Sequence, residues 1–346
     1  MTSSKTLHTV DDLLREKLID LQDAPALELL SKQYAIAISP EMVKLIHTAG
    51  DPIGRQYIPH PDERITRNEE MADPIGDEAL SPVPGIVHRY EDRVLLKPIL
   101  ACPVYCRFCF RREQVGPENG LLSEEQLQNA LQWIQSHTEI REVILSGGEP
   151  LMLSPRRMKM IIDSLNAITH VTTIRLHSRL PFSAPNLLKD SLVDMLATSK
   201  ALWIVLHANH AAEFTENAFK AVQKLQQKAI PLLGQSVLLS GVNDRVDALE
   251  ALFRAMVEWR IKPYYLHQLD RAPGTARFYV PIQTGQQLLA GLRGRVTGLA
   301  WPTYVLDIPG GYGKVPLGPE YYHSDHPDSI YDPYGKIHQL SLSEKG

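Results

Sequence analysis

Between residues 93 and 292 the chain alternates short runs typical of β-strands with longer amphipathic runs typical of helices. This rhythm favours parallel βαβ units, because each helical run is long enough to cross back over a sheet. Units in series predict an α/β fold with a full or partial (β/α) barrel, and an open doubly wound sheet is the competing arrangement. The strand–helix pairs are expected at 143–146 with 156–168, 172–177 with 187–198, 202–207 with 216–229, 232–239 with 246–258, and 264–269 with 285–292.

The two ends of the chain follow a different pattern. Residues 1–85 show helical periodicity at 10–21 and 25–34, and then a stretch rich in Pro, Gly and Asp without a clear period. We expect a helical and irregular N-terminal extension there, with the barrel core at 86–300. Residues 301–346 are expected to form a lysine-bearing loop and a loosely packed tail.

The composition argues against several classes of protein. Hydrophobic residues make up 44% and charged residues 22% of the chain, which is typical of a soluble globular protein. A formal net charge of −4 gives no indication of nucleic-acid binding. The N-terminus lacks the apolar run of a secretory signal and no apolar stretch is long enough to span a bilayer, so we expect a cytoplasmic protein without a membrane partner.

All three cysteines lie in one short run, Cys102-Pro-Val-Tyr-Cys106-Arg-Phe-Cys109. A disulfide would leave one thiol unpaired, and the cytoplasm disfavours disulfides, so the run points to metal. Three thiolates on one loop can hold three irons of a [4Fe–4S] cluster and leave the fourth iron open for a chelating small molecule. Zinc is the weaker interpretation, because structural zinc sites close with four ligands and only His88, distant in sequence, offers a fourth.

Two further segments carry candidate chemistry. The Ser-Gly-Gly-Glu run at 146–149 follows a predicted strand, where glycines let a ligand approach the backbone and the glutamate can pair with an ammonium group. Near the C-terminus a β-type run delivers Asp307 into a glycine-rich loop that ends at Lys314. Glycine N–H groups can cradle a phosphate, and this lysine could form a Schiff base with pyridoxal phosphate. Taken alone, each segment also suits a surface turn.

Together these motifs carry a family resemblance. The spacing C-x3-C-x2-C resembles the signature of the radical S-adenosylmethionine (SAM) superfamily, and the Gly-Gly-Glu run resembles its motif for the methionine amino group. With the Lys314 loop on the same chain, the combination resembles the lysine 2,3-aminomutase family. That resemblance implies a partial (β/α) barrel of the radical SAM type, a [4Fe–4S] cluster, SAM and pyridoxal 5′-phosphate. It also implies an isomerase that converts L-lysine to β-lysine by 1,2-amino migration.

The resemblance assigns roles to individual residues. Lys314 corresponds to the lysine that holds pyridoxal phosphate, and Arg89 and Arg93 correspond to the basic residues at its phosphate. Arg111 corresponds to the arginine that clamps the substrate carboxylate, a task suited to a bidentate guanidinium. The cluster ligands implied are Cys102, Cys106 and Cys109, and further cofactor contacts are implied for Ser146, Gly147, Gly148, Glu149, Gln235 and His207.

Two carboxylates decide the expected substrate. Asp270 and Asp307 correspond to the residues that hold the side-chain ammonium of lysine. Two negative charges do not suit glutamate, so lysine is the first choice and arginine the alternative. β-Lysine for the modification of elongation factor P is another purpose for the same reaction. The rival of a different class is a non-enzymatic iron–sulfur or zinc binding module.

The chain departs from the family pattern at several positions. It has no cysteine beyond the triplet, and Arg245 stands where the zinc-binding type has one, so no zinc is expected. The homo-oligomer that zinc supports is therefore left open. His267 stands where a tyrosine is usual and Phe108 where a histidine is common, and both could alter contacts to the adenosyl group. An electron donor such as flavodoxin or ferredoxin is also implied.

Overall fold

Nine strands of this computed structural model form one continuous sheet. The structure describes residues 5–116, 120–322, 324–325, 329–332 and 335–340. The strands are β1 (Ile86–Tyr90), β2 (Arg93–Ile99), β3 (Glu142–Gly147), β4 (Thr173–Ser178), β5 (Ala201–His207), β6 (Leu232–Val237), β7 (Lys262–His267), β8 (Thr303–Ile308) and β9 (Gly313–Pro316).

The order of the strands in the sheet is their order in the chain. Strands β2 to β8 run parallel, whereas β1 and β9 pair antiparallel at the two edges. A doubly wound sheet would reverse its strand order at a switch point, so this order excludes that alternative. Among the described residues β1 does not pair with β9, so the sheet curls without closing. The predicted partial (β/α) barrel is confirmed.

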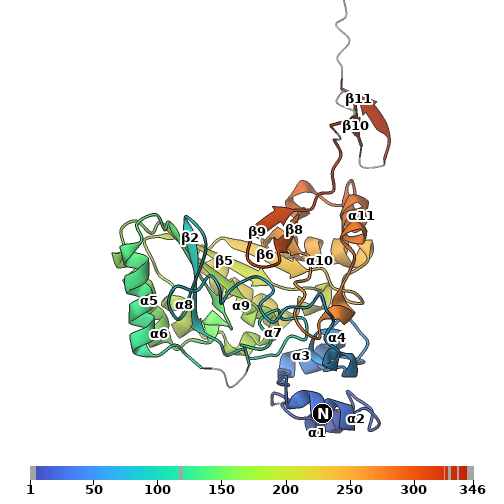
Figure 1. Ribbon diagram of the computed structural model, residues 1–346, viewed down its shortest axis with the longest axis horizontal. Coiled ribbons are helices and arrows are strands. Elements are labelled where there is room, and N and C mark those ends of the chain that lie inside the picture. Colours follow the sequence, from blue (N-terminus) through green and yellow to red (C-terminus); the bar gives the residue numbers. More distant parts are fainter. Residues whose placement is uncertain (1–4, 117–119, 323, 326–328, 333–334, 341–346) are drawn as a thin grey trace, which may run out of the picture.

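The longer helices cover the outer face of the sheet (Figure 1). Four of them, α6, α9, α10 and α11, lie where amphipathic runs predict them. Among the described residues, no helix is long and apolar enough to cross a bilayer. The helices are α5 (Glu124–Ser136), α6 (Pro155–Ala167), α7 (Leu180–Ser183), α8 (Asp190–Asp194), α9 (Glu216–Gln227), α10 (Val246–Glu258) and α11 (Ile282–Leu292).

Three expectations about the barrel elements were wrong or incomplete. Helix α5 was not predicted, although Ser123 and Gln126 form a capping box at its start. The helix predicted at 187–198 is reduced to α8, because Leu188 takes an extended backbone after a short 3₁₀ turn. Strand β7 ends two residues earlier than predicted, so Asp270 lies beyond its carboxyl end.

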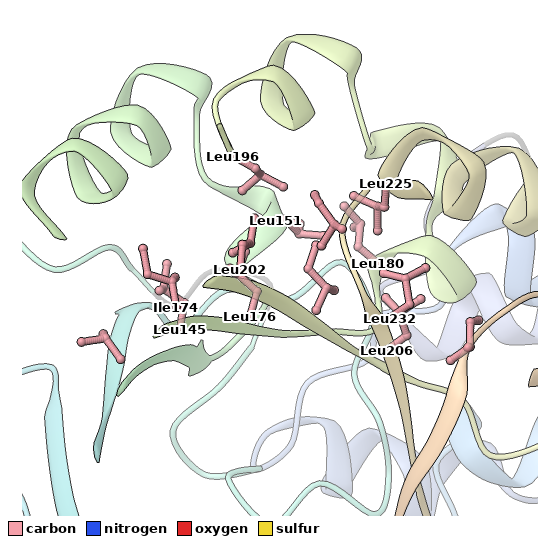
Figure 2. Close-up of a cluster of buried hydrophobic side chains, with 14 of the residues drawn as sticks. Leu145, Leu151, Ile174, Leu176, Leu180, Leu196, Leu202, Leu206, Leu225 and Leu232 are labelled. Atoms are coloured by element: carbon pink, nitrogen blue, oxygen red, sulfur yellow. The ribbon is translucent and has the colours of Figure 1, made fainter. Parts of the chain in front are cut away.

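Side chains of the parallel strands alternate between an apolar outer face and a polar inner face. On β4, Ile174 and Leu176 point outward and are fully buried, whereas Arg175 and His177 point into the barrel. Figure 2 shows the outward-facing side chains packed between the strands and the helices. The labelled residues of this core are Leu145, Leu151, Ile174, Leu176, Leu180, Leu196, Leu202, Leu206, Leu225 and Leu232.

The N-terminal extension has a small core of its own. It lies below the barrel in the view of Figure 1. Its buried residues include Leu13, Leu27 and Ile38, and they pack with Val104 and Tyr105 of the cysteine run. The first predicted helix, at 10–21, is shorter because Lys17 adopts a positive φ of 57°. The elements are α1 (Val10–Arg15), α2 (Ala24–Ser31), α3 (Pro40–Leu45), α4 (Gly54–Tyr57) and the 3₁₀ helix η1 (Pro61–Arg64).

The C-terminal tail leaves the barrel after β9. Strands β10 (Ser329–Tyr331) and β11 (Ile337–Gln339) pair antiparallel as a small separate sheet. Figure 1 shows this hairpin standing away from the rest of the molecule. The part of the tail that is described therefore contains a hairpin that the sequence did not predict.

Candidate active site

The curled sheet encloses a cavity of about 770 Å³ that is lined by residues from all nine strands. Every residue to which the family resemblance assigns a role lines this one cavity. They come from seven of the nine strands, from the segments that follow β3 and β7, and from the cysteine run and the residue Arg111 just after it. Segments separated by more than 200 residues are thus brought to the same space.

The cysteine run follows β2 and forms one wall of the cavity. Cys102, Cys106 and Cys109 are free thiols there, and Nη1 of Arg179 lies 3.4 Å from Sγ of Cys106. Burial raises the pKa of all three thiols, and repulsion from Cys106 contributes to a pKa of about 11 for Cys109. As thiolates, the three cysteines would carry buried negative charges. A positively charged group bound between them would compensate these charges.

The donor set fits an iron–sulfur cluster better than a single metal ion. Within the described ranges, no three His, Cys, Asp or Glu side chains close around one ion. A cluster binds each thiolate to a different iron, so its ligands need not converge on one point. His88 does not line the cavity, because its ring packs against Trp133 at 5.2 Å. The zinc alternative with His88 as fourth ligand is therefore wrong.

The two glycines after β3 lie directly against the chain segment that leads into Cys102. Gly147 has a φ of 100°, which favours glycine. A Cβ atom on Gly148 would lie 2.5 Å from the carbonyl oxygen of Ala101. A side chain at Gly148 would thus push on the residue that precedes Cys102, so the glycines permit this close approach.

Backbone N–H groups orient the carboxylate of Glu149 in the cavity wall. Its Oε2 accepts hydrogen bonds from the N–H groups of Arg179 and Leu180 at 2.8 and 3.0 Å, and its Oε1 accepts one from Leu151 at 3.0 Å. Burial raises the pKa of Glu149 to about 7, although these donors favour its charged form. A bound ammonium group would therefore compensate a buried charge at this position.

Lys314 lies on strand β9 and not in the glycine-rich loop, which is a correction to the sequence analysis. It pairs in register with Asp307 on β8. Nζ of Lys314 lies 2.6 Å from Oδ2 of Asp307, and Nη1 of Arg89 donates to Oδ1 at 2.7 Å. Burial alone would raise the pKa of Asp307, but Lys314 and Arg89 outweigh it and the pKa is lowered. Asp307 therefore holds Lys314 inside the cavity.

Arg89 and Arg93 line the same cavity, but each has partners of its own. Nη2 of Arg89 donates to the carbonyl oxygen of Ile75 at 2.7 Å. Arg93 donates to Asp92 at 2.6 Å and stacks over the ring of Tyr90 at 3.8 Å. Their shared role at a cofactor phosphate stays a prediction.

Arg111 follows the cysteine run and Asp270 follows β7, and both residues line the cavity. Nε of Arg111 donates to Oδ2 of the buried Asp77 at 2.6 Å, which fixes the guanidinium plane. Burial and the neighbouring Asp307 raise the pKa of Asp270 to about 7. Within the described part of the chain no basic side chain forms an ion pair with Asp270. A cation could thus bind to Asp270.

Sequence reasoning missed two functional candidates on β4 and just after it. His177 is partly buried and lines the cavity, and its buried Nε2 has no hydrogen-bond partner among the described residues. Arg179 is buried, pairs with Glu213 at 2.7 Å and contacts Cys106. The alternation of polar and apolar residues along β4 was the available signal, because it places Arg175 and His177 on the inner face.

His267 and Phe108, two residues that depart from the family pattern, also line the cavity. Burial and the neighbouring Lys314 lower the pKa of His267 to about 3, so its ring is neutral. Phe108 packs against the ring of His207, with 5.8 Å between ring centres. His207 and Gln235 face the cavity from neighbouring strands, β5 and β6.

Comparison with known proteins agrees with this geometry. A family model described as the radical SAM superfamily matches residues 96–253, and one described as lysine-2,3-aminomutase matches residues 289–331. An L-lysine 2,3-aminomutase of Methanococcus maripaludis is 39% identical over 86% of this chain and 69% of its own length. One from Fusobacterium nucleatum is 37% identical over 94% and 77%, respectively. A glutamate 2,3-aminomutase of Clostridioides difficile is 32% identical over 94% and 78%.

These relatives are similar over nearly the whole of the described barrel and not over one motif alone. The match to the Fusobacterium nucleatum protein covers 94% of this chain, so it includes the cysteine run, the barrel strands and the strand that carries Lys314. The cavity offers three thiols and a lysine to the cofactors that such enzymes use. The chain therefore belongs to the lysine 2,3-aminomutase family, as a radical SAM aminomutase that works with a [4Fe–4S] cluster, SAM and pyridoxal phosphate.

Proposed function

We propose that this chain converts L-lysine to β-lysine by moving the amino group from C2 to C3. One observation carries the choice of substrate: Asp270 and Asp307 face the cavity together. Asp307 contributes to the raised pKa of Asp270, so the two carboxylates are close enough to repel each other. A cationic side chain relieves this repulsion, whereas glutamate would add a third negative charge. The names of most of the similar proteins also support lysine.

The chain's own residues bind and orient the substrate. When bound, the cluster and SAM supply a 5′-deoxyadenosyl radical, and pyridoxal phosphate supplies a carbonyl group that takes up the amino group. Asp307 keeps Lys314 in the cavity, where its amine can hold the cofactor. Asp77 fixes Arg111 through its Nε. The terminal nitrogens of Arg111 can then bind the substrate carboxylate.

An assay of the reconstituted enzyme with three amino acids tests the proposal. The protein is loaded anaerobically with iron, sulfide and pyridoxal phosphate, and is then given SAM, a reductant and lysine, arginine or glutamate. We expect β-lysine as the main product by NMR, because two carboxylates favour a compact ammonium group. A higher kcat/KM for arginine or glutamate than for lysine would reject lysine as the substrate.

Asp270 is expected to give lysine turnover a characteristic pH dependence. The pKa of Asp270 is raised to about 7, so the carboxylate is protonated below that pH and charged above it. Since only the charged form attracts the side-chain ammonium, kcat/KM should rise as the pH increases through about 7. Asp270→Asn should remove this limb and lower kcat/KM roughly ten- to a hundredfold, the effect of losing a charged hydrogen bond.

A surface carboxylate provides the control for this measurement. Asp163 pairs with Lys159 on the exposed face of α6, so Asp163→Asn should leave the pH profile unchanged. A rising limb that survives in Asp270→Asn would show that another group titrates there.

A further inference from the structure

The N-terminal extension places one buried carboxylate beneath the cysteine run. Glu63 of η1 is 1% exposed and accepts hydrogen bonds from two buried arginines, one within the cysteine run and one just after it. Nη2 and Nε of Arg107 donate to its Oε2 at 2.6 and 2.9 Å. Nη2 of Arg112 donates to the same oxygen at 2.5 Å. Glu63 thus joins a residue that follows Cys106 directly to one that lies three residues after Cys109.

Backbone carbonyl groups of the same extension also accept hydrogen bonds from the cysteine run. Nη1 of Arg107 donates to the carbonyl oxygen of Ala35 at 2.7 Å, and its N–H donates to the carbonyl of Gln56 at 2.8 Å. The N–H of Tyr105 donates to the carbonyl of Ala37 at 2.8 Å. These bonds align the run along the extension, while Glu63 supplies the only carboxylate bound to Arg107 or Arg112 among the described residues.

Glu63, Arg107 and Arg112 together carry an excess positive charge. Burial opposes ionisation of Glu63, but Arg107 and Arg112 outweigh it and the pKa of Glu63 lies below its ordinary value. One carboxylate therefore balances one of two guanidinium groups. Arg107 directly follows Cys106, and the N–H of Arg112 donates to the carbonyl oxygen of Cys109 at 3.2 Å. Both guanidinium groups are thus carried by residues attached to the predicted cluster ligands.

We propose that Glu63 is a positioning residue for the iron–sulfur cluster, which fixes the two arginines around Cys109 and sets the charge that the cluster experiences. The reduction potential of such a cluster depends on nearby charge. The reduced cluster carries one more negative charge than the oxidised one. Removing a negative charge beneath it therefore makes reduction easier, and removing a positive charge makes it harder.

A pair of charge-changing variants tests this role on the cluster-loaded protein. Glu63→Gln keeps the shape of the side chain and should move the reduction potential to less negative values. It should also release iron to a chelator roughly tenfold faster, because it loses charge-assisted hydrogen bonds. Arg112→Gln should move the potential in the opposite direction. The double variant should return it close to that of wild type, as measured by an EPR-monitored redox titration.

Another buried carboxylate of the same extension provides the matched control. Glu41 on α3 is 6% exposed and accepts hydrogen bonds from Thr215 and Asn217, away from the cysteine run. Glu41→Gln should leave the potential unchanged. The proposal is overturned if Glu63→Gln has the wild-type potential, or if Glu41→Gln shifts it equally. If Glu63→Gln does not fold, the sign of the shift in Arg112→Gln decides.

Discussion

Lys314→Ala is expected to lower the rate of lysine rearrangement by a factor of roughly 10³ or more, because it removes the amine proposed to hold pyridoxal phosphate. The iron content and visible spectrum of the cluster should stay those of wild type. Lys314 lies on β9, whereas the three cysteines lie in the run that follows β2. Borohydride reduction followed by peptide mapping should find the pyridoxal group on Lys314 in wild type and nowhere in the variant.

Two further lysine variants show whether this effect is specific. Lys314→Arg retains a cation beside Asp307 but cannot hold the cofactor covalently, so it should be as inactive as Lys314→Ala. Lys262 lies on β7 and donates to the carbonyls of Pro263 and Trp301 outside the cavity. Lys262→Ala should therefore keep normal turnover. Substantial turnover by Lys314→Arg would contradict the proposed covalent role.

Local patterns in the sequence were sufficient to predict parallel βαβ units, whereas the family resemblance implied the partial barrel and most of the candidate residues in its cavity. Period-2 runs located the strands, because outward apolar residues such as Ile174 and Leu176 alternate with inward polar ones. The spacing of Cys102, Cys106 and Cys109 indicated the cluster, because it depends on one short loop. The roles that the resemblance assigns to the cavity residues remain predictions, although all of these residues face the same space.

Long-range partners could not be predicted in this way. Arg89 was expected at a phosphate, but it donates to Asp307, which is 218 positions away. Glu63 lies 44 positions before Arg107, in a segment that offered no clear period. Such pairs are set by how distant segments pack. Lys314 was expected at the end of a loop, because the glycines before it indicate a turn but do not show that β9 begins at Gly313.

Cys106→Ser is expected to abolish SAM cleavage, because two remaining thiols cannot hold three irons of the cluster. Iron analysis should show little bound cluster after anaerobic reconstitution, and 5′-deoxyadenosine should stay below detection. The variant should still take up pyridoxal phosphate at Lys314, since β8 and β9 hold that residue independently of the cysteine run. The barrel core should be unaffected, because Cys106 packs against the core of the N-terminal extension and a small cluster around Phe108, and among the described residues it is not part of the main barrel core.

Cys106→Ser and Lys314→Ala together test the cluster site and the pyridoxal phosphate site separately. The first should lose iron and keep the pyridoxal group, and the second should do the reverse. Arg179 makes the cysteine variant a sharper test, because its guanidinium lies 3.4 Å from Sγ of Cys106 and would lose a thiolate partner but keep Glu213. The fold around it should therefore survive. A Cys106→Ser protein with full iron content and SAM cleavage would show that Cys106 does not ligate the cluster.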